Sequence, residues 1–132
     1  LLFNSIHHVA IICSDYKKSK YFYTVILGFN VIAENYREER QSYKLDLKLP
    51  NGDQLELFSF PNPANRSSMP EALGLRHLAF NVNSVEQTCD YLVSKGITVE
   101  AIRVDEYTGK KFTFFNDPDG LPLELYEQTG IQ

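Results

Sequence analysis

The 132-residue chain has the length of one ordinary domain or of two very small ones. Hydrophobic residues make up 43% of it and aromatic residues 13%, which indicates a folded protein with a real core. Thirteen basic and seventeen acidic residues give a net charge of −4, whereas proteins that bind nucleic acids or membrane surfaces usually carry basic patches. No apolar run approaches the roughly 18 residues of a membrane span, and no signal peptide is evident. We therefore expect an acidic, globular, cytoplasmic protein that binds neither nucleic acid nor a membrane.

A repeated pattern runs through the chain at an offset of 68 or 69 residues. Four landmarks hold this offset: His-x-Ala at 8–10 and 77–79, Gly28 and Gly96, Asn51-Gly52 and Asp119-Gly120, and Leu-Glu-Leu at 55–57 and 123–125. We predict two copies of one module, over residues 5–60 and 74–128. The linker between them, 61–73, is rich in residues that disfavour regular structure. Together they form a single domain over residues 1–132.

The same order of elements is predicted in both modules. The first module is expected to contain a strand at 6–13, a helix capped by Asp15 and ended by Gly28, and strands at 29–37, 43–49 and 54–60. The second is expected to contain a strand at 75–82, a helix that starts with the Ser84 and Gln87 capping box and ends at Gly96, and strands at 98–104, 110–116 and 122–127. The Asn-Gly and Asp-Gly dipeptides then join the last two strands of each module as hairpins. Each module is thus a βαβββ unit.

Two such modules predict an α+β fold with a curved eight-stranded mixed sheet, helices outside and a metal-containing cavity inside. Side chains alternate between the two faces of a strand. If His8 points into the cavity, then Glu56 shares its face, while the leucines on either side of Glu56 pack under the helix. The same parity places His77 and Glu124 inside in the second module.

These four residues, His8, Glu56, His77 and Glu124, predict a divalent-metal site. A single strand histidine is more often a hydrogen-bonded core residue, and a single Glu between leucines usually faces solvent. The matched positions in two modules reverse that balance, because a buried carboxylate is costly unless a partner such as a metal ion compensates it. The absence of cysteine from the set disfavours a closed structural zinc site. His7 has the opposite parity and is left out of the set, and Cys13 and Cys89 are expected to pack as small hydrophobic residues.

The paired modules, these four residues and the closing Asn116-Asp117-Pro118-Asp119-Gly120…Glu124 motif resemble the vicinal oxygen chelate superfamily, the glyoxalase I, bleomycin resistance and dioxygenase group. The resemblance covers almost the whole chain and extends to short bacterial glyoxalase-like proteins. It implies one divalent ion (Ni, Co, Zn, Mn or Fe) held by the four residues. It also implies a lyase or isomerase that acts on a small oxygen-chelating metabolite through a metal-stabilised enediolate. Glu124 would be the catalytic base, with Glu56 as its symmetry partner.

Two other activities within this resemblance stay open: an Fe(II) extradiol-type dioxygenase and a drug- or metabolite-binding resistance protein. A glutamate at position 56 favours the lyase, because the dioxygenases use only three ligands. The chain departs from glutathione-using members at Ile12, where they place an arginine, and at Phe60, where they often use asparagine. Candidate residues for holding an anionic substrate are Arg37, Arg103, Lys110 and Lys111. A homodimer is expected, because a curved sheet in a chain of this size leaves edges that another copy can cover. The two modules can close the cavity within one chain or by exchange between two chains, since the reach of the linker allows both.

Overall fold

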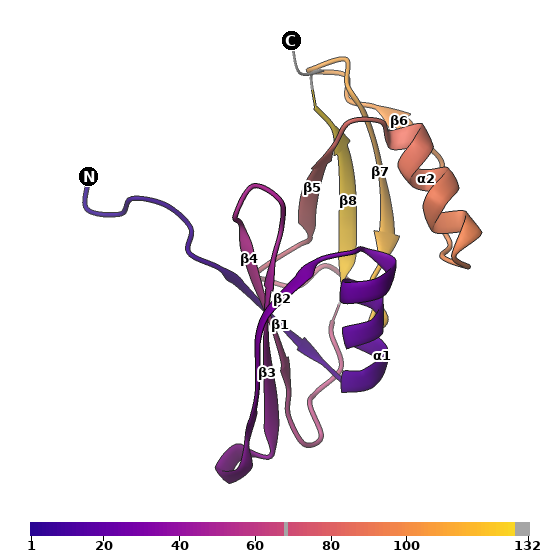
Figure 1. Cartoon of the computed structure of the whole chain (residues 1–132). Coiled ribbons are helices and arrows are strands. Elements are labelled where there is room, and N and C mark those ends of the chain that lie inside the picture. The colour runs from indigo at the N-terminus through magenta and orange to yellow at the C-terminus, as the bar shows by residue number, and fades with distance from the viewer. Residues whose placement is uncertain (68, 129–132) are drawn as a thin grey trace. The chain divides into compact units, whose positions relative to one another are not determined.

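The computed structural model describes residues 1–67 and 69–128 (Figure 1). The chain divides into two compact units, Leu1–Asn65 and Arg66–Gln132, and each carries one four-stranded mixed sheet. Residue 68 of the predicted linker and residues 129–132 of the predicted domain lie outside the described residues. The predicted α+β class and the two βαβββ repeats are confirmed.

The first unit contains one helix and four strands in the predicted order. Its elements are β1 (Val9–Cys13), α1 (Tyr16–Tyr21) with a π-helical turn (Phe22–Ile26), β2 (Asn30–Arg37), a 3-10 turn (Glu38–Arg40), β3 (Ser42–Lys48) and β4 (Gln54–Ser59). The strand order is β1-β4-β3-β2, with β1 parallel to β4 and the other pairs antiparallel. This order places the first strand beside the last, so that a histidine before β1 lies next to a glutamate on β4.

The helix of the first unit begins and ends where the sequence predicts. The carboxylate of Asp15 accepts a hydrogen bond from the backbone N–H of Lys18, 3.2 Å away, and so satisfies one of the free donors of the first turn. The last turn widens into a π-helix, in which the N–H of Leu27 donates to the carbonyl of Phe22. Gly28 then leaves the helix with a φ of +79°, a conformation that other residues rarely adopt.

The core of the first unit lies on one face of its sheet. Four leucines on the two central strands, Leu45, Leu47, Leu55 and Leu57, are at most 5% exposed. Glu56 lies between two of them in sequence and therefore projects from the opposite face. The alternation predicted for the first module is confirmed on β4.

The second unit repeats this arrangement. Its elements are β5 (Leu78–Val82), α2 (Val85–Ser94), β6 (Arg103–Val104), β7 (Lys111–Asn116) and β8 (Pro122–Glu127), in the strand order β5-β8-β7-β6. Leu123 and Leu125 are buried under α2, and Glu124 projects from the other face. The two glutamates thus occupy equivalent positions, each on the strand that pairs in parallel with the first strand of its sheet.

Helix α2 lies along one face of the second sheet (Figure 1). The hydroxyl of Ser84 accepts a hydrogen bond from the N–H of Gln87 at 3.1 Å, which confirms the predicted cap. Val85, Cys89 and Leu92 form the buried stripe of the helix. Cys13 of the first unit is also buried, so both cysteines pack inside as expected.

Three strands are shorter than the sequence predicts by three residues or more. β1 and β5 begin at Val9 and Leu78, because their pairing with β4 and β8 starts there. β6 has two residues rather than seven. The buried hydroxyl of Thr113 donates to the carbonyls of Glu100 and Ala101, at 2.8 and 3.1 Å, so a side chain replaces part of the backbone ladder. An isolated bridge joins Val99 to Phe115.

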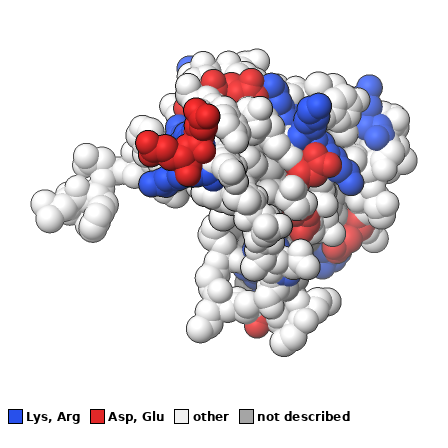
Figure 2. Space-filling model, turned by 90° about the horizontal axis from the view of Figure 1, so that it is seen from below, with Lys and Arg blue, Asp and Glu red and all other residues white. Residues whose placement is uncertain are grey.

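Acidic and basic side chains are interspersed over the surface seen in Figure 2. Within the described part of the chain, no helix is both long and apolar enough to cross a membrane. Both predicted turns are formed: Gly52 donates its N–H to the carbonyl of Leu49 and Gly120 to that of Asp117, and both glycines have positive φ.

Candidate metal centre

The first candidate pair, His8 and Glu56, lies where β1 begins beside β4. Ala10 is in register with Glu56, so His8, two residues before Ala10, approaches the same carboxylate from the neighbouring strand. Nδ1 of His8 is 3.4 Å from Oε2 of Glu56. The glutamate side chain is 12% exposed and the histidine 38%, so the pair lies at a partly open surface of the sheet face that α1 does not cover.

The second pair, His77 and Glu124, repeats this geometry. Ala79 is in register with Glu124, and Nε2 of His77 is 3.0 Å from Oε1 of the glutamate. The Phe114 ring meets the His77 ring edge-on, at a centroid distance of 5.1 Å. Nδ1 of His77 is buried and has no hydrogen-bond partner among the described residues, which leaves Nε2 as the nitrogen that faces the carboxylate.

The spacing of both pairs fits two donors of one metal ion. Donor atoms at about 2.1 Å from an ion, with angles between octahedral and tetrahedral values, lie about 3.0 to 3.4 Å apart. The same distances also suit a hydrogen bond from the imidazole to the carboxylate. No three His, Cys, Asp or Glu side chains gather in one place within residues 1–67 and 69–128. Each module therefore brings together one His–Glu pair of the predicted four.

The surroundings of the two glutamates differ in charge. Glu56 has Asp46 as its register partner on β3, and the ammonium of Lys44 lies 3.8 Å from its Oε1. Lys44 also contacts Asp46 at 2.7 Å, and this hydrogen bond is the main reason that the pKa of Lys44 is raised, with the negative charges of Asp46 and Glu56 adding to it. Two neighbours therefore hold the carboxylate of Glu56 in one orientation, the imidazole of His8 and the ammonium of Lys44.

Aromatic rings take the place of these charges around Glu124. Its register partner is Phe114, and Phe112 meets Phe114 edge-on at 6.3 Å and stacks with Tyr126 at 6.5 Å. Among the described residues no ammonium or guanidinium lies within 4.0 Å of the Glu124 carboxylate. Glu124 is thus paired with His77 and otherwise faces apolar surfaces.

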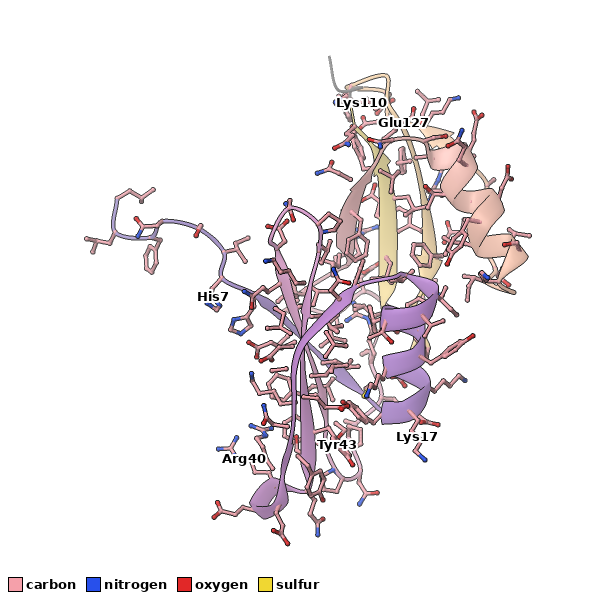
Figure 3. All side chains as sticks on the ribbon, in the orientation of Figure 1. His7, Lys17, Arg40, Tyr43, Lys110 and Glu127 are labelled. Atoms are coloured by element: carbon pink, nitrogen blue, oxygen red, sulfur yellow. The ribbon has the colours of Figure 1, made fainter. Side chains whose placement is uncertain are left out.

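His7 was excluded from the predicted set because its parity is opposite to that of His8. β1 begins at Val9, so strand alternation does not extend to His7. The Nδ1 atoms of His7 and His8 are 2.9 Å apart, and the two rings meet edge-on (Figure 3). His7 therefore contacts the first pair through His8.

Tyr126 is a neighbour of the second His–Glu pair. It lies two residues beyond Glu124 on the same face of β8, and its hydroxyl donates to the carboxylate of Asp105 at 2.9 Å. The pKa of Asp105 is lowered, first by the backbone N–H of Tyr107 and then by this hydroxyl. The loop after β6 is thus tied to the strand that carries Glu124.

Both arginines predicted to contact substrate stack on aromatic rings. The Arg37 guanidinium lies 4.9 Å from the ring centre of Phe58 and 5.7 Å from that of Phe60. The Arg103 guanidinium lies 5.0 and 5.4 Å from the ring centres of Phe112 and Phe114, and it also forms an ion pair with Glu100 at 3.0 Å.

The two predicted lysines have different surroundings. Lys111 is ion-paired with Glu86 of α2, which places its side chain on the helix-covered face, away from Glu124. Lys110 lies just before β7 (Figure 3), and its carbonyl accepts the N–H of Asp105. Arg37 and Arg103 therefore each lie on the face of their own sheet that carries a His–Glu pair, whereas Lys111 lies on the opposite face.

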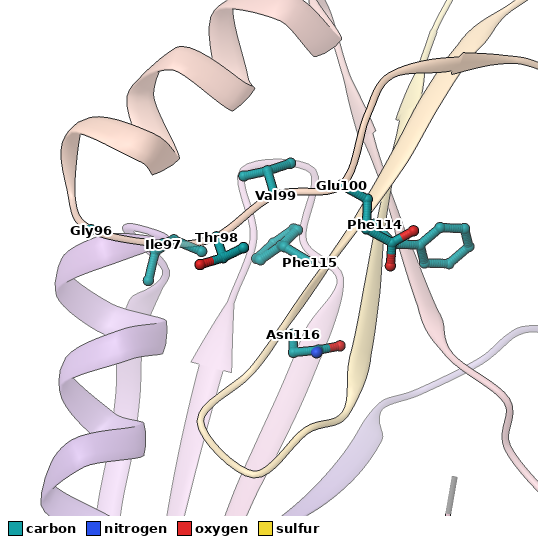
Figure 4. A pocket seen from close by; sticks show the side chains of 8 residues that line it. All are labelled: Gly96, Ile97, Thr98, Val99, Glu100, Phe114, Phe115 and Asn116. Atoms are coloured by element: carbon teal, nitrogen blue, oxygen red, sulfur yellow. The ribbon is translucent and has the colours of Figure 1, made fainter. Parts of the chain in front are cut away.

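Two pockets lie apart from the His–Glu pairs. One, of about 320 Å³, lies between the segment after α2 and β7 and is lined by residues 96–100 and 114–116 (Figure 4). The other, of about 580 Å³, lies beside α1 and includes Tyr16, Glu34 and Tyr43. Burial raises the pKa of the Tyr16 hydroxyl, and its bond to the Glu34 carboxylate adds to this effect. Neither pocket includes a predicted metal ligand.

Comparison with known proteins agrees with this architecture. The family model described as the glyoxalase/bleomycin resistance protein/dioxygenase superfamily matches residues 5–125. The uncharacterized protein YwkD of Bacillus subtilis is 63% identical over 128 residues, which cover 97% of this chain and all of YwkD. The crystal structure of a glyoxalase family protein from Enterococcus faecalis is 54% identical, with a TM-score of 0.90 over 96% of this chain and all of that one. A lactoylglutathione lyase of Schizosaccharomyces pombe is 27% identical over 94% of this chain and 47% of the lyase.

Proposed function

The chain belongs to the glyoxalase/bleomycin resistance protein/dioxygenase superfamily, and we propose that it is a divalent-metal-dependent lyase or isomerase of glyoxalase type. Its substrate would be a small metabolite with two neighbouring oxygen atoms. The observation that carries the proposal is the repeated His–Glu pair, with nitrogen-to-oxygen distances of 3.4 and 3.0 Å at equivalent positions of the two modules. The similarity to a lactoylglutathione lyase supports the reaction class.

The proposed ligands are His8, Glu56, His77 and Glu124. Two neutral imidazoles and two carboxylates form a donor set suited to Ni, Co, Zn, Mn or Fe. A bound ion of this kind supplies a positive charge that stabilises the oxyanion of a reacting carbonyl compound. The fit rests on the donor chemistry and on the two distances, since ligands of one ion are spaced in this way.

Glu124 is the proposed base. It must take a proton from the carbon beside the substrate carbonyl, so its carboxylate has to move between ligand and substrate. Glu56 is held by the Lys44 ammonium at 3.8 Å as well as by His8, whereas among the described residues Glu124 contacts His77 and has no ammonium or guanidinium within 4.0 Å. The register partner of Glu124 is Phe114, whereas that of Glu56 is Asp46, so the surroundings of Glu124 are less charged.

Metal binding by single-histidine variants tests the proposal. The affinity of the purified protein for Ni²⁺ or Co²⁺ is measured by calorimetry for the wild type, His8→Ala and His77→Ala. We expect each variant to lose more than about 100-fold in affinity, since even outer-shell partners are typically worth 10- to 100-fold. Asp90→Ala is the control, because it removes a carboxylate from the exposed face of α2 that belongs to neither pair, and it should bind with wild-type affinity.

Wild-type affinity in both the His8→Ala and His77→Ala variants would contradict the donor set. Oxygen consumption by the Fe²⁺-loaded protein with a catechol, retained in Glu56→Ala, would instead identify a three-ligand dioxygenase. These outcomes separate the metal site from the reaction class.

A further inference from the structure

Arg37 differs from Lys44 and Arg103 in having no acidic partner among the described residues. Its Nη2 donates to the hydroxyl of Ser42 at 2.8 Å. Its guanidinium lies over the Phe58 and Phe60 rings, which are nearly parallel, with an angle of 10° between their planes. No Asp or Glu oxygen lies within 4.0 Å of the guanidinium among the described residues, and its Nε is buried without a hydrogen-bond partner. The guanidinium is therefore held in position without charge neutralisation.

The matching arginine of the second module shows the contrast. Arg103 also lies over two phenylalanine rings, but its guanidinium is ion-paired with Glu100 at 3.0 Å. Lys44, the other cation beside Glu56, contacts Asp46 at 2.7 Å. Among the described residues, Arg37 therefore lies on this face without an ion-pair partner, unlike Lys44.

Arg37 also lies on the sheet face that carries Glu56. It is in register with Ser42 on β3, and even-numbered residues of β3 share a face with Glu56 through the pairing of Asp46 with Glu56. Phe58, on which the guanidinium stacks, lies two residues beyond Glu56 on the same strand and on the same face. Two residues of a strand span about 7 Å, so Phe58 lies about 7 Å along β4 from Glu56, and the guanidinium over Phe58 and Phe60 lies at that distance or slightly beyond.

We propose that Arg37 binds a carboxylate of the substrate, about 7 Å from the oxygen atoms that chelate the metal. This inference rests on the proposed function, because it assumes that the chelating end of the substrate lies at Glu56. A guanidinium presents parallel N–H donors that match the two oxygens of a carboxylate, and stacking on Phe58 and Phe60 holds the plane of this fork. The substrate class is therefore a short carboxylic acid whose far end carries vicinal oxygens.

Two chelators that differ by one charge test this assignment. The monohydroxamic acid of glutaric acid places a carboxylate about 7 Å from its chelating oxygens when extended, and its primary amide has the same length without the charge. Both are titrated into the Co²⁺-loaded protein, with calorimetry and the visible absorption of Co²⁺ as readouts. We expect the wild type to bind the carboxylate probe at least about tenfold more tightly than the amide, as for a charge-assisted hydrogen bond.

Arg37→Gln should bring the two affinities to within about twofold of each other and leave the affinity for the amide probe unchanged. Arg37→Lys keeps a cation and the apolar stem, so it should give an intermediate preference for the carboxylate probe. It replaces Arg37→Gln as the test variant if circular dichroism shows that the Gln variant is unfolded. Arg40→Gln is the matched control, since it removes an exposed arginine three residues away in the 3-10 turn (Figure 3).

The outcomes separate this proposal from the proposed function. Tight binding of both probes without preference in the wild type, or an unchanged preference in Arg37→Gln, would overturn the role of Arg37 and leave the metal site intact. Binding of neither probe to the Co²⁺-loaded protein would overturn both proposals.

Discussion

Asp117 belongs to the closing motif of the chain and holds the turn that precedes the strand of Glu124. It is 5% exposed, and its Oδ1 accepts hydrogen bonds from the backbone N–H groups of Asp119 and Leu121, both at 2.9 Å. Its own N–H and carbonyl bond to Leu121 and Gly120. This turn determines where β8 begins, and β8 carries Glu124.

The cost of Asp117→Ala follows from these contacts. Two backbone donors lose a charged acceptor, and a hydrogen bond to a charged group is worth about 1.5 to 3 kcal/mol. The turn is partly accessible to water, which can replace one of the two bonds, so we expect a loss of about 3 kcal/mol in the free energy of unfolding. For a chain of this size that corresponds to a fall of about 10 °C in the melting temperature.

Urea unfolding followed by circular dichroism measures this loss. Asp117→Asn keeps one side-chain acceptor and should lose about 1 kcal/mol. Asp90→Ala, on the exposed face of α2, removes a carboxylate without buried contacts and should stay within about 0.5 kcal/mol of the wild type. If Asp117→Ala were no less stable than Asp90→Ala, the turn would not depend on this carboxylate, and the reasoning would be refuted.

Three further predictions follow from the structure. Glu124→Gln should retain the fold and much of the metal affinity but lose at least about 100-fold in turnover once a substrate is known, because an amide cannot accept the proton; wild-type turnover would transfer the base role to Glu56. The pKa of Glu34 is lowered from its ordinary value of 4.5, first by Lys20 and then by the Tyr16 hydroxyl. The wild type should therefore exceed Glu34→Gln in stability at neutral pH and lose that advantage as the pH falls below about 4.5, which urea unfolding at pH 7 and pH 3 would show; a difference independent of pH would contradict it. If the proposed homodimer exchanges modules between chains, refolding His8→Ala and His77→Ala together should regenerate some high-affinity metal sites, whereas sites built within one chain would all stay defective; a monomer by light scattering would exclude the homodimer.

The sequence by itself determined the repeated βαβββ order and the face on which each glutamate lies. Both depend on short-range rules: strand side chains alternate with a period of two, and a cap or a glycine acts within one turn of helix. Glu56 and Glu124 could be assigned to the uncovered faces because leucines flank each of them. The repeat then predicted that His8 and His77 lie beside these glutamates. The register of β1 with β4 and of β5 with β8 agrees with this prediction.

Only the tertiary structure decided which charges are already paired. Arg37 and Arg103 read alike in the sequence, yet Glu100 neutralises Arg103 whereas Ser42 leaves the charge of Arg37 uncompensated. Lys111 faces α2 because it pairs with Glu86, which is 25 residues away in the chain. Such pairings join residues that are distant in sequence, and they depend on side-chain directions that no local pattern specifies. The same reason explains why β6 was predicted too long, since the Thr113 hydroxyl that replaces its ladder lies on another strand.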